Sequence, residues 1–119
     1  DLLLKRGFDS LEIGEFSDAA WHFSALVDHA PDFAEGYYGR ATAFYEMGEL
    51  GLALHDVQMA LSLNSRHFVA LTGLGSVQEE LGHLPEALTA YRLAQSLNPH
   101  MEGLAEAIER VESQVSILH

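Results

Sequence analysis

The sequence predicts an all-α protein built from repeated helix pairs, and three observations lead to this prediction. A similar phrase occurs three times at one fixed spacing, as "EIGEFSDA" at 12–19, "EMGELGLA" at 46–53 and "ELGHLPEA" at 80–87. In each phrase a glycine follows a segment with helical periodicity, where helices commonly end in a left-handed residue. The sequence also lacks any long alternation of apolar and polar residues, the pattern of a β-strand.

Two stop signals in each repeat divide the chain into about seven predicted helices. The first helix of each pair ends at Gly14, Gly48 or Gly82, and the second ends at Pro31, Ser65 or Pro99, which follow these glycines at a constant interval. Pro85 falls in the first turn of a predicted helix, where its missing N–H leaves no hydrogen bond unmade. The predicted helices span residues 2–13, 16–29, 34–47, 50–63, 68–81, 84–97 and 101–115.

The last predicted helix differs from the others in its pattern. Leu104, Ile108, Val111 and Val115 form one narrow apolar stripe, and the opposite face is polar. A stack of helix pairs needs a last helix that is polar on its outer side, because no further repeat covers it. We therefore interpret residues 102–116 as a capping helix.

The repeat pattern resembles the tetratricopeptide repeat family along nearly the whole chain. The third copy fits best, with small or apolar residues at fixed places: Leu71, Leu74, Gly75, Ala87, Tyr91 and a final Pro99. The resemblance implies a single domain over residues 1–119, a right-handed superhelix of antiparallel helix pairs, with repeats at about 1–33, 34–67 and 68–101. Arg6 and Arg40 stand where the family usually has Leu, and we expect them to extend to solvent or to pair with neighbouring acids.

The charge of the chain excludes several classes of partner. Six Lys and Arg residues face 18 Asp and Glu residues, which gives a formal net charge of −12. Nucleic acids and anionic membranes would be repelled, and no apolar run is long enough to insert into a membrane. The first residues, "DLLLKRGF", lack Met, so we expect a piece of a longer protein. The stretch "RHFVALTGLG" resembles proteobacterial repeat proteins, which leaves bacterial cytoplasm and periplasm both open for a soluble protein.

Signals for catalysis or metal binding are weak. The chain has no cysteine, no glycine-rich phosphate loop and no serine nucleophile motif. His22 and His29 could share a helix face, but the His spacing typical of zinc sites is missing. Glu79 and Glu80 are adjacent on a helix, so their carboxylates diverge. The sequence therefore predicts no enzyme, no cofactor and no metal site.

The family resemblance implies a ligand groove, because the first helix of each pair lines the inner face in this family. The matching residues are Leu4, Phe8, Leu11, Glu12, Tyr38, Gly39, Thr42, Tyr45, Glu46, Thr72, Gly73, Ser76, Glu79 and Glu80. The predicted partner is a peptide segment or a partner helix, and the acidic residues predict a preference for neutral or basic ligands.

Two features of this predicted groove are unfavourable for the helices themselves. Gly39 and Gly73 lie mid-helix, where each costs about 1 kcal/mol relative to Ala. Glu12, Glu46 and Glu80 lie at helix C-terminal ends, where a negative charge meets the negative end of the helix dipole. One explanation for both features is a bound partner: the glycines would leave room for its backbone, and the glutamates would attract a basic group on it. The alternative is that the glycines relieve crowding and the glutamates are ordinary solvated charges.

One branch of the family binds acidic chaperone tails through a clamp of Lys, Asn and Arg. The matching positions here hold Leu4, Phe8, Gly39, Val69 and Gly73, so the resemblance does not extend to that ligand. An alternative function is a structural or oligomerisation segment, in which Val115, Ile117 and Leu118 would mediate self-association through the C-terminal helix.

Overall fold

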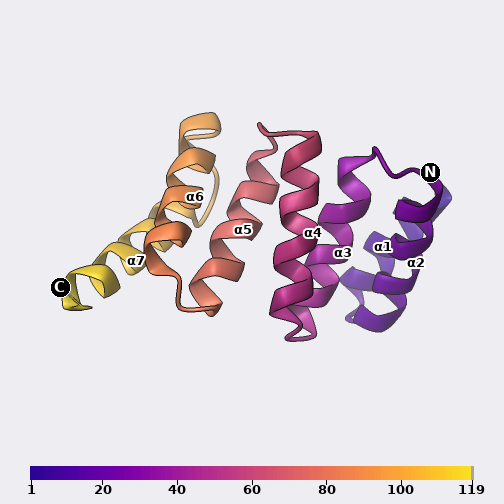
Figure 1. The fold of residues 1–119 in the computed structure, drawn as a ribbon, viewed down its shortest axis with the longest axis horizontal. Helices are drawn as coiled ribbons and strands as arrows, with labels where there is room; N and C mark the ends of the chain where they lie inside the picture. The colour runs from indigo at the N-terminus through magenta and orange to yellow at the C-terminus, as the bar shows by residue number, and fades with distance from the viewer. Residues whose placement is uncertain (119) are drawn as a thin grey trace. The chain divides into compact units, whose positions relative to one another are not determined.

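The computed structural model describes residues 1–118, with side chains through residue 117, and within this range the protein is all helical (Figure 1). The helices are α1 (Leu2–Glu12), α2 (Phe16–His29), α3 (Ala34–Glu46), α4 (Leu50–Leu63), α5 (Phe68–Glu80), α6 (Leu84–Leu97) and α7 (Leu104–Leu118). The prediction of an all-α protein with seven helices is confirmed. None of the helices in residues 1–118 is long and apolar enough to cross a bilayer.

The chain forms two compact units, Asp1–Ser65 and Arg66–His119. In the first unit α1 packs on α2, α2 on α3, and α3 on α4. In the second unit α5 packs on α6, and α6 on α7. Consecutive helices within each unit run antiparallel, as Figure 1 shows. A single domain over residues 1–119 stays a prediction.

The three repeated glycines end their helices as the sequence predicts. Gly14, Gly48 and Gly82 have φ angles of 80°, 77° and 81°, in the left-handed region that a side chain disfavours. In the first repeat the Glu15 N–H donates to the Ser10 carbonyl over 2.8 Å, and the Gly14 N–H donates to the Leu11 carbonyl over 3.1 Å. This pair of bonds satisfies carbonyls that the helix end leaves unpaired.

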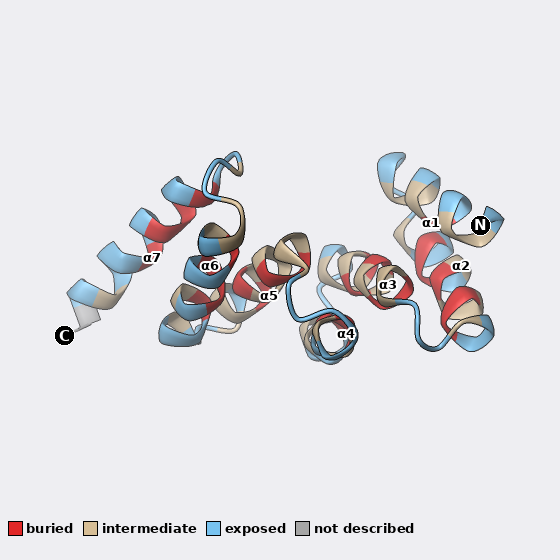
Figure 2. Ribbon diagram, turned by 90° about the horizontal axis from the view of Figure 1, so that it is seen from above, coloured by how far each residue is buried: buried red, intermediate tan, exposed pale blue. Residues whose placement is uncertain are grey.

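The C-terminal helix begins at Leu104, three residues after the start of the predicted helix 101–115 and two after the start of the capping helix interpreted at 102–116. Residues 101–103 form a turn, and Gly103 has a φ of 81°. Because the helix starts at Leu104, its buried residues Leu104, Ala107, Ile108 and Val111 lie in its first half. These residues pack the helix on α6, and the second half is largely exposed (Figure 2).

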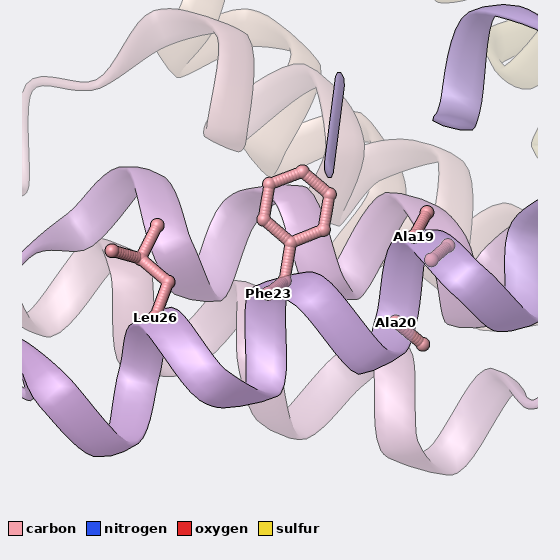
Figure 3. Close-up of a cluster of buried hydrophobic side chains, with 5 residues drawn as sticks. Ala19, Ala20, Phe23 and Leu26 are labelled. Carbon is pink, nitrogen blue, oxygen red and sulfur yellow. The ribbon is translucent and has the colours of Figure 1, made fainter. Parts of the chain in front are cut away.

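The core of the first unit gathers around Phe23, on α2. Ala19, Ala20, Leu26 and Ala43 are buried with it (Figure 3). The Phe23 ring is the largest side chain in this cluster, and three of its four buried neighbours are alanines. The ring fills the space between α1 and α3, where Gly7 and Gly39 approach it.

Candidate functional site

The apolar groove residues of α1 belong partly to the core. Leu4, Phe8 and Leu11 are half-buried and pack against the cluster around Phe23. The rings of Phe8 and Phe23 meet edge to face, with centroids 5.1 Å apart and planes at 76°. Leu4, Phe8 and Leu11 therefore stabilise the first unit, and only the exposed part of each remains for a partner.

Gly39 makes room for the core and not for a partner. A Cβ at this buried position would lie 2.3 Å from Cε1 and 2.4 Å from Cζ of Phe23. Gly7 on α1 approaches the same ring, because its Cβ would lie 2.5 Å from Phe23 Cζ. The explanation that Gly39 leaves open space in the groove is therefore corrected: the Phe23 ring already occupies that space.

The tyrosines of α3 are half-buried. Burial raises the pKa of Tyr38, while hydrogen bonding by Thr42 partly opposes this shift. Tyr45 lies two helical turns further along α3, and both tyrosines also interact with other residues of the chain. A phenol ring that is half exposed offers apolar area and a hydroxyl to a ligand at a small entropic cost.

The threonine and serine hydroxyls of the predicted groove bind their own helices. The Thr42 hydroxyl donates to the Tyr38 carbonyl over 3.1 Å, and Ser76, at the equivalent place in the next repeat, donates to the Thr72 carbonyl over 3.2 Å. Thr72 donates to the Phe68 carbonyl over 3.0 Å. Their oxygens can still accept a hydrogen bond, but their protons are already used.

The repeated glutamates occupy equivalent exposed places. Glu12, Glu46 and Glu80 are the last residues of α1, α3 and α5, and each lies at least partly exposed. Gly73, on α5, is half-buried. Of the predicted groove residues, those on α1 and α3 lie in the first unit, where the two helices touch, and those on α5 lie in the second.

Arg40 forms an ion pair with a buried acid, one of the two outcomes expected for it. Its Nε and a terminal nitrogen donate to the two carboxylate oxygens of Asp56, over 2.7 and 2.9 Å. A further nitrogen reaches Ser24 Oγ at 3.3 Å, and the Asp56 side chain is only 2% exposed. The hydrogen bonds to Asp56 raise the pKa of Arg40. This pair joins α3 to α4 and is structural.

Glu79, in the second unit, is held by α7 and α6 and is not a free groove charge. Arg110 of α7 donates to both of its carboxylate oxygens over 2.8 Å, and the Tyr91 hydroxyl donates to Oε1 over 2.9 Å. The Arg110 bonds hold the pKa of Glu79 below its ordinary value, although burial opposes them. Burial and the contact with Glu79 raise the pKa of Tyr91 to about 12. Sequence reasoning missed this network, because Arg110 lies outside the repeats.

A pocket of about 570 Å³ lies beside this network, also within the second unit. One wall is the α5–α6 turn and the other is the exposed end of α7. The lining residues are Glu79, Glu80, Gly82, Leu84, Gln114 and Ile117.

Two histidines, His67 and His83, form hydrogen bonds with residues close to them in the sequence. His67 Nδ1 accepts the Ala70 N–H at 3.0 Å and so caps the start of α5. His83 Nδ1 lies 2.7 Å from Gln78 Oε1. Across residues 1–118 no group of three or more His, Asp or Glu side chains is placed to hold a metal ion.

Comparison with known proteins identifies the repeat. A family model described as "Tetratricopeptide repeat" matches residues 4–58 and 38–102. The chain is 33% identical to DnaJ homolog subfamily C member 3 of Mus musculus over an alignment of 104 residues. This alignment covers 87% of this chain and 21% of that protein. The matched segment spans about a fifth of the length of this relative and of the human tetratricopeptide repeat protein 6, and 42% of a TPR repeat-containing protein of Rhizobium etli.

Two solved structures illustrate the likeness of the fold. The first TPR domain of Spaghetti (RPAP3), solved with the HSP90 peptide SRMEEVD, superposes with a TM-score of 0.93 at 20% identity, over 97% of this chain and 91% of that one. MamA superposes with a TM-score of 0.90 at 27% identity, over 96% of this chain and 67% of that one. These neighbours confirm the tetratricopeptide-type arrangement of helix pairs.

Proposed function

Because this chain belongs to the tetratricopeptide repeat family, we propose that it is a non-catalytic module that binds a peptide segment or a partner helix. The observation that carries the proposal is the pair of half-buried tyrosines, Tyr38 and Tyr45, on a helix whose last residue is the exposed Glu46. Glu12 ends the neighbouring helix α1 and is also exposed. Aromatic anchors beside carboxylates suit a neutral or basic partner.

The structural neighbours support binding of a peptide, but the peptides in those structures are acidic and do not support a preference for neutral or basic ligands. Two domains of RPAP3 were solved with the peptides SRMEEVD and SGPTIEEVD, both of which end in acidic residues. At the clamp positions of the first unit this chain has Leu4, Phe8 and Gly39, and the last of these faces Phe23. A ligand that ends in several carboxylates would therefore meet no matching cation there and would be repelled by the net charge of −12.

A binding titration against peptides from the native partner tests the proposal. Tyr38→Ala or Tyr45→Ala should weaken affinity by about 1–3 kcal/mol, because aromatic anchors dominate such interfaces. Trp21→Ala is the matched control, since Trp21 is an aromatic residue on α2 with 70% of its surface exposed. Equal losses in all three variants, or tighter binding of SRMEEVD than of a lysine-containing peptide, would contradict the proposal.

The alternative of an oligomerisation segment has one observation in its favour. Ile117, near the end of α7, is 83% exposed, and Val115 is half-buried. The side chain of Leu118, the third residue of the predicted self-association surface, lies outside the described residues. Light scattering over a range of concentrations distinguishes the two functions, because self-association through Ile117 would be abolished by Ile117→Ser.

A further inference from the structure

The pocket of the second unit combines one unpaired carboxylate with apolar walls. Both oxygens of Glu79 are occupied by Arg110, and this side chain is only 18% exposed. Among the residues that the structure describes, the carboxylate of Glu80 has no hydrogen-bond or ion-pair partner. Leu84 and Ile117 add apolar surface, and Gln114 adds an amide. The net charge that the pocket offers to a ligand is therefore negative and comes from Glu80.

The walls of the pocket are held in place before any ligand arrives. The apolar first half of α7 is buried, with Leu104 2% and Val111 0% exposed. The bonds from Arg110 to Glu79 then fix α7 to the end of α5, and Arg92 donates to Glu112 over 2.6 Å from α6. A helix held in this way lowers the entropic cost of binding for the backbone, and the exposed side chains of Glu80, Gln114 and Ile117 are what a ligand would have to order.

We propose that this pocket takes a single lysine side chain from a partner segment. The aliphatic stem of the lysine would lie along Leu84 and Ile117, and its ammonium would reach Glu80 and the carbonyl oxygen of Gln114. An ammonium with three donors fits one carboxylate and one amide better than a planar guanidinium, which prefers a bidentate carboxylate. This inference rests on the proposed binding function and assigns one side chain of the partner.

Two other occupants agree less well with the pocket. An acidic side chain would place its carboxylate against Glu80 in an already acidic protein. A purely apolar side chain would leave the Glu80 carboxylate partly desolvated without a partner. Arg110 does not reverse this preference, because its charge is already neutralised by Glu79.

An NMR titration of the full chain, labelled with ¹⁵N, tests the inference with small probes. The probe is Nα-acetyl-lysine N-methylamide, and the matched probe is the norleucine analogue, which has the same stem without the charge. The lysine probe should shift the amide signals of Gly82, Leu84, Gln114 and Ile117 in saturable fashion, and the norleucine probe should bind more weakly. Both titrations are carried out at the same low ionic strength, because exposed charge pairs are screened by salt.

Variants separate this pocket from the general acidity of the surface. Glu80→Gln should weaken the lysine probe about two- to fivefold, the effect of one solvent-accessible ion pair. Glu86→Gln is the matched control, since Glu86 is an exposed acid of α6 that does not line the pocket, and it should leave the affinity unchanged. Equal weakening by both variants, equal binding of both probes, or shifts spread over the whole surface would overturn the inference.

The outcomes also distinguish this inference from the proposed function. If the lysine probe leaves the four amides unshifted while partner binding still depends on Tyr38, only the lysine pocket is wrong. If the probe binds at Glu80 but no partner binding depends on Tyr38 or Tyr45, the pocket stands and the proposed inner-face function fails. Concentration-dependent shifts of the same amides without any probe would assign the pocket to a second copy of the chain and overturn the inference.

Discussion

Replacing Gly39 by Ala tests whether this mid-helix glycine serves the core or a ligand. The Phe23 ring lies against Gly39 of α3 on one side and Gly7 of α1 on the other. A Cβ at position 39 would lie 2.3, 2.4 and 2.7 Å from three carbons of that ring, closer than side chains in folded proteins approach one another. Phe23 is 0% exposed, so the ring cannot move into solvent.

Two effects of opposite sign decide the magnitude. Helix propensity alone favours Ala over Gly by about 1 kcal/mol. Inserting a methyl group into a close-packed core costs about 1–3 kcal/mol, and Gly7 blocks the direction in which Phe23 would withdraw, which favours the upper end. We therefore expect Gly39→Ala to lower the free energy of unfolding by about 1–2 kcal/mol.

Urea denaturation followed by the fluorescence of Trp21 measures this change. Trp21 lies on α2, two residues before Phe23, and is the only tryptophan in the chain. Gly51→Ala is the control, because Gly51 is an exposed glycine of α4 whose added Cβ would meet nothing within 4 Å. This control should be as stable as the wild type or more stable, by at most about 1 kcal/mol.

A double-variant cycle shows whether the ring causes the effect. In a Phe23→Leu background the clash is relieved, so adding Gly39→Ala should cost much less than it does alone. If Gly39→Ala proves as stable as Gly51→Ala, position 39 faces open space and the packing argument is wrong. Loss of ligand binding without loss of stability would restore the explanation of Gly39 as a groove residue.

Two further predictions concern the ion pairs. Asp56→Ala should lower the free energy of unfolding by about 3 kcal/mol, because it leaves the guanidinium of Arg40, 19% exposed, without its partner. The double variant with Arg40→Leu should recover most of this loss in the same urea assay, and a double variant no more stable than the single one would contradict the argument. The pKa of Glu79 is lowered in the folded chain, so its pair with Arg110 stabilises α7 fully above the ordinary carboxylate pKa of about 4.3 and less as pH falls through the lowered value. The difference in melting temperature between wild type and Arg110→Gln should therefore be constant near neutral pH and shrink below about pH 4, and a difference that grows in acid would refute this assignment.

The repeat helices could be predicted from the sequence because each end is specified locally. The six helices of the repeats begin where predicted and end at the predicted residue or one earlier. Gly14, Gly48 and Gly82 can adopt the left-handed conformation at no steric cost, and each helix ends two residues before its glycine. The start of α7 lies three residues after the predicted one, because the turn at Gly103 has no counterpart in the repeat pattern.

The surroundings of the groove residues could not be predicted in the same way. The environment of Gly39 depends on which side chain of α2 enters the space between α1 and α3. The state of Glu79 depends on Arg110, which is distant in the sequence and outside the repeats. Helical periodicity assigns a residue to a face, but it does not say which long side chain from another helix reaches that face.

Differences between the copies of the repeat carry some of this missing information. Arg40 and Asp56 form an ion pair, and in the next copy both equivalent positions are apolar, Leu74 and Ala90. In the first copy the equivalent residues are Arg6 and His22, so the arginine recurs there without the acid, and only the third copy replaces both charged residues.

Position 79 changes together with one partner inside the repeat. The residues equivalent to Glu79 are Leu11 and Tyr45, and those equivalent to its hydrogen-bond donor Tyr91 are Phe23 and Val57. The second partner of the Glu79 carboxylate, Arg110, belongs to a helix outside the repeats. Glu12, Glu46 and Glu80 behave in a third way, since the same acid recurs at three exposed helix ends where the helix dipole disfavours it. The recurrence agrees with the basic partner proposed above, and ordinary solvation of an exposed charge at a helix end explains it equally well.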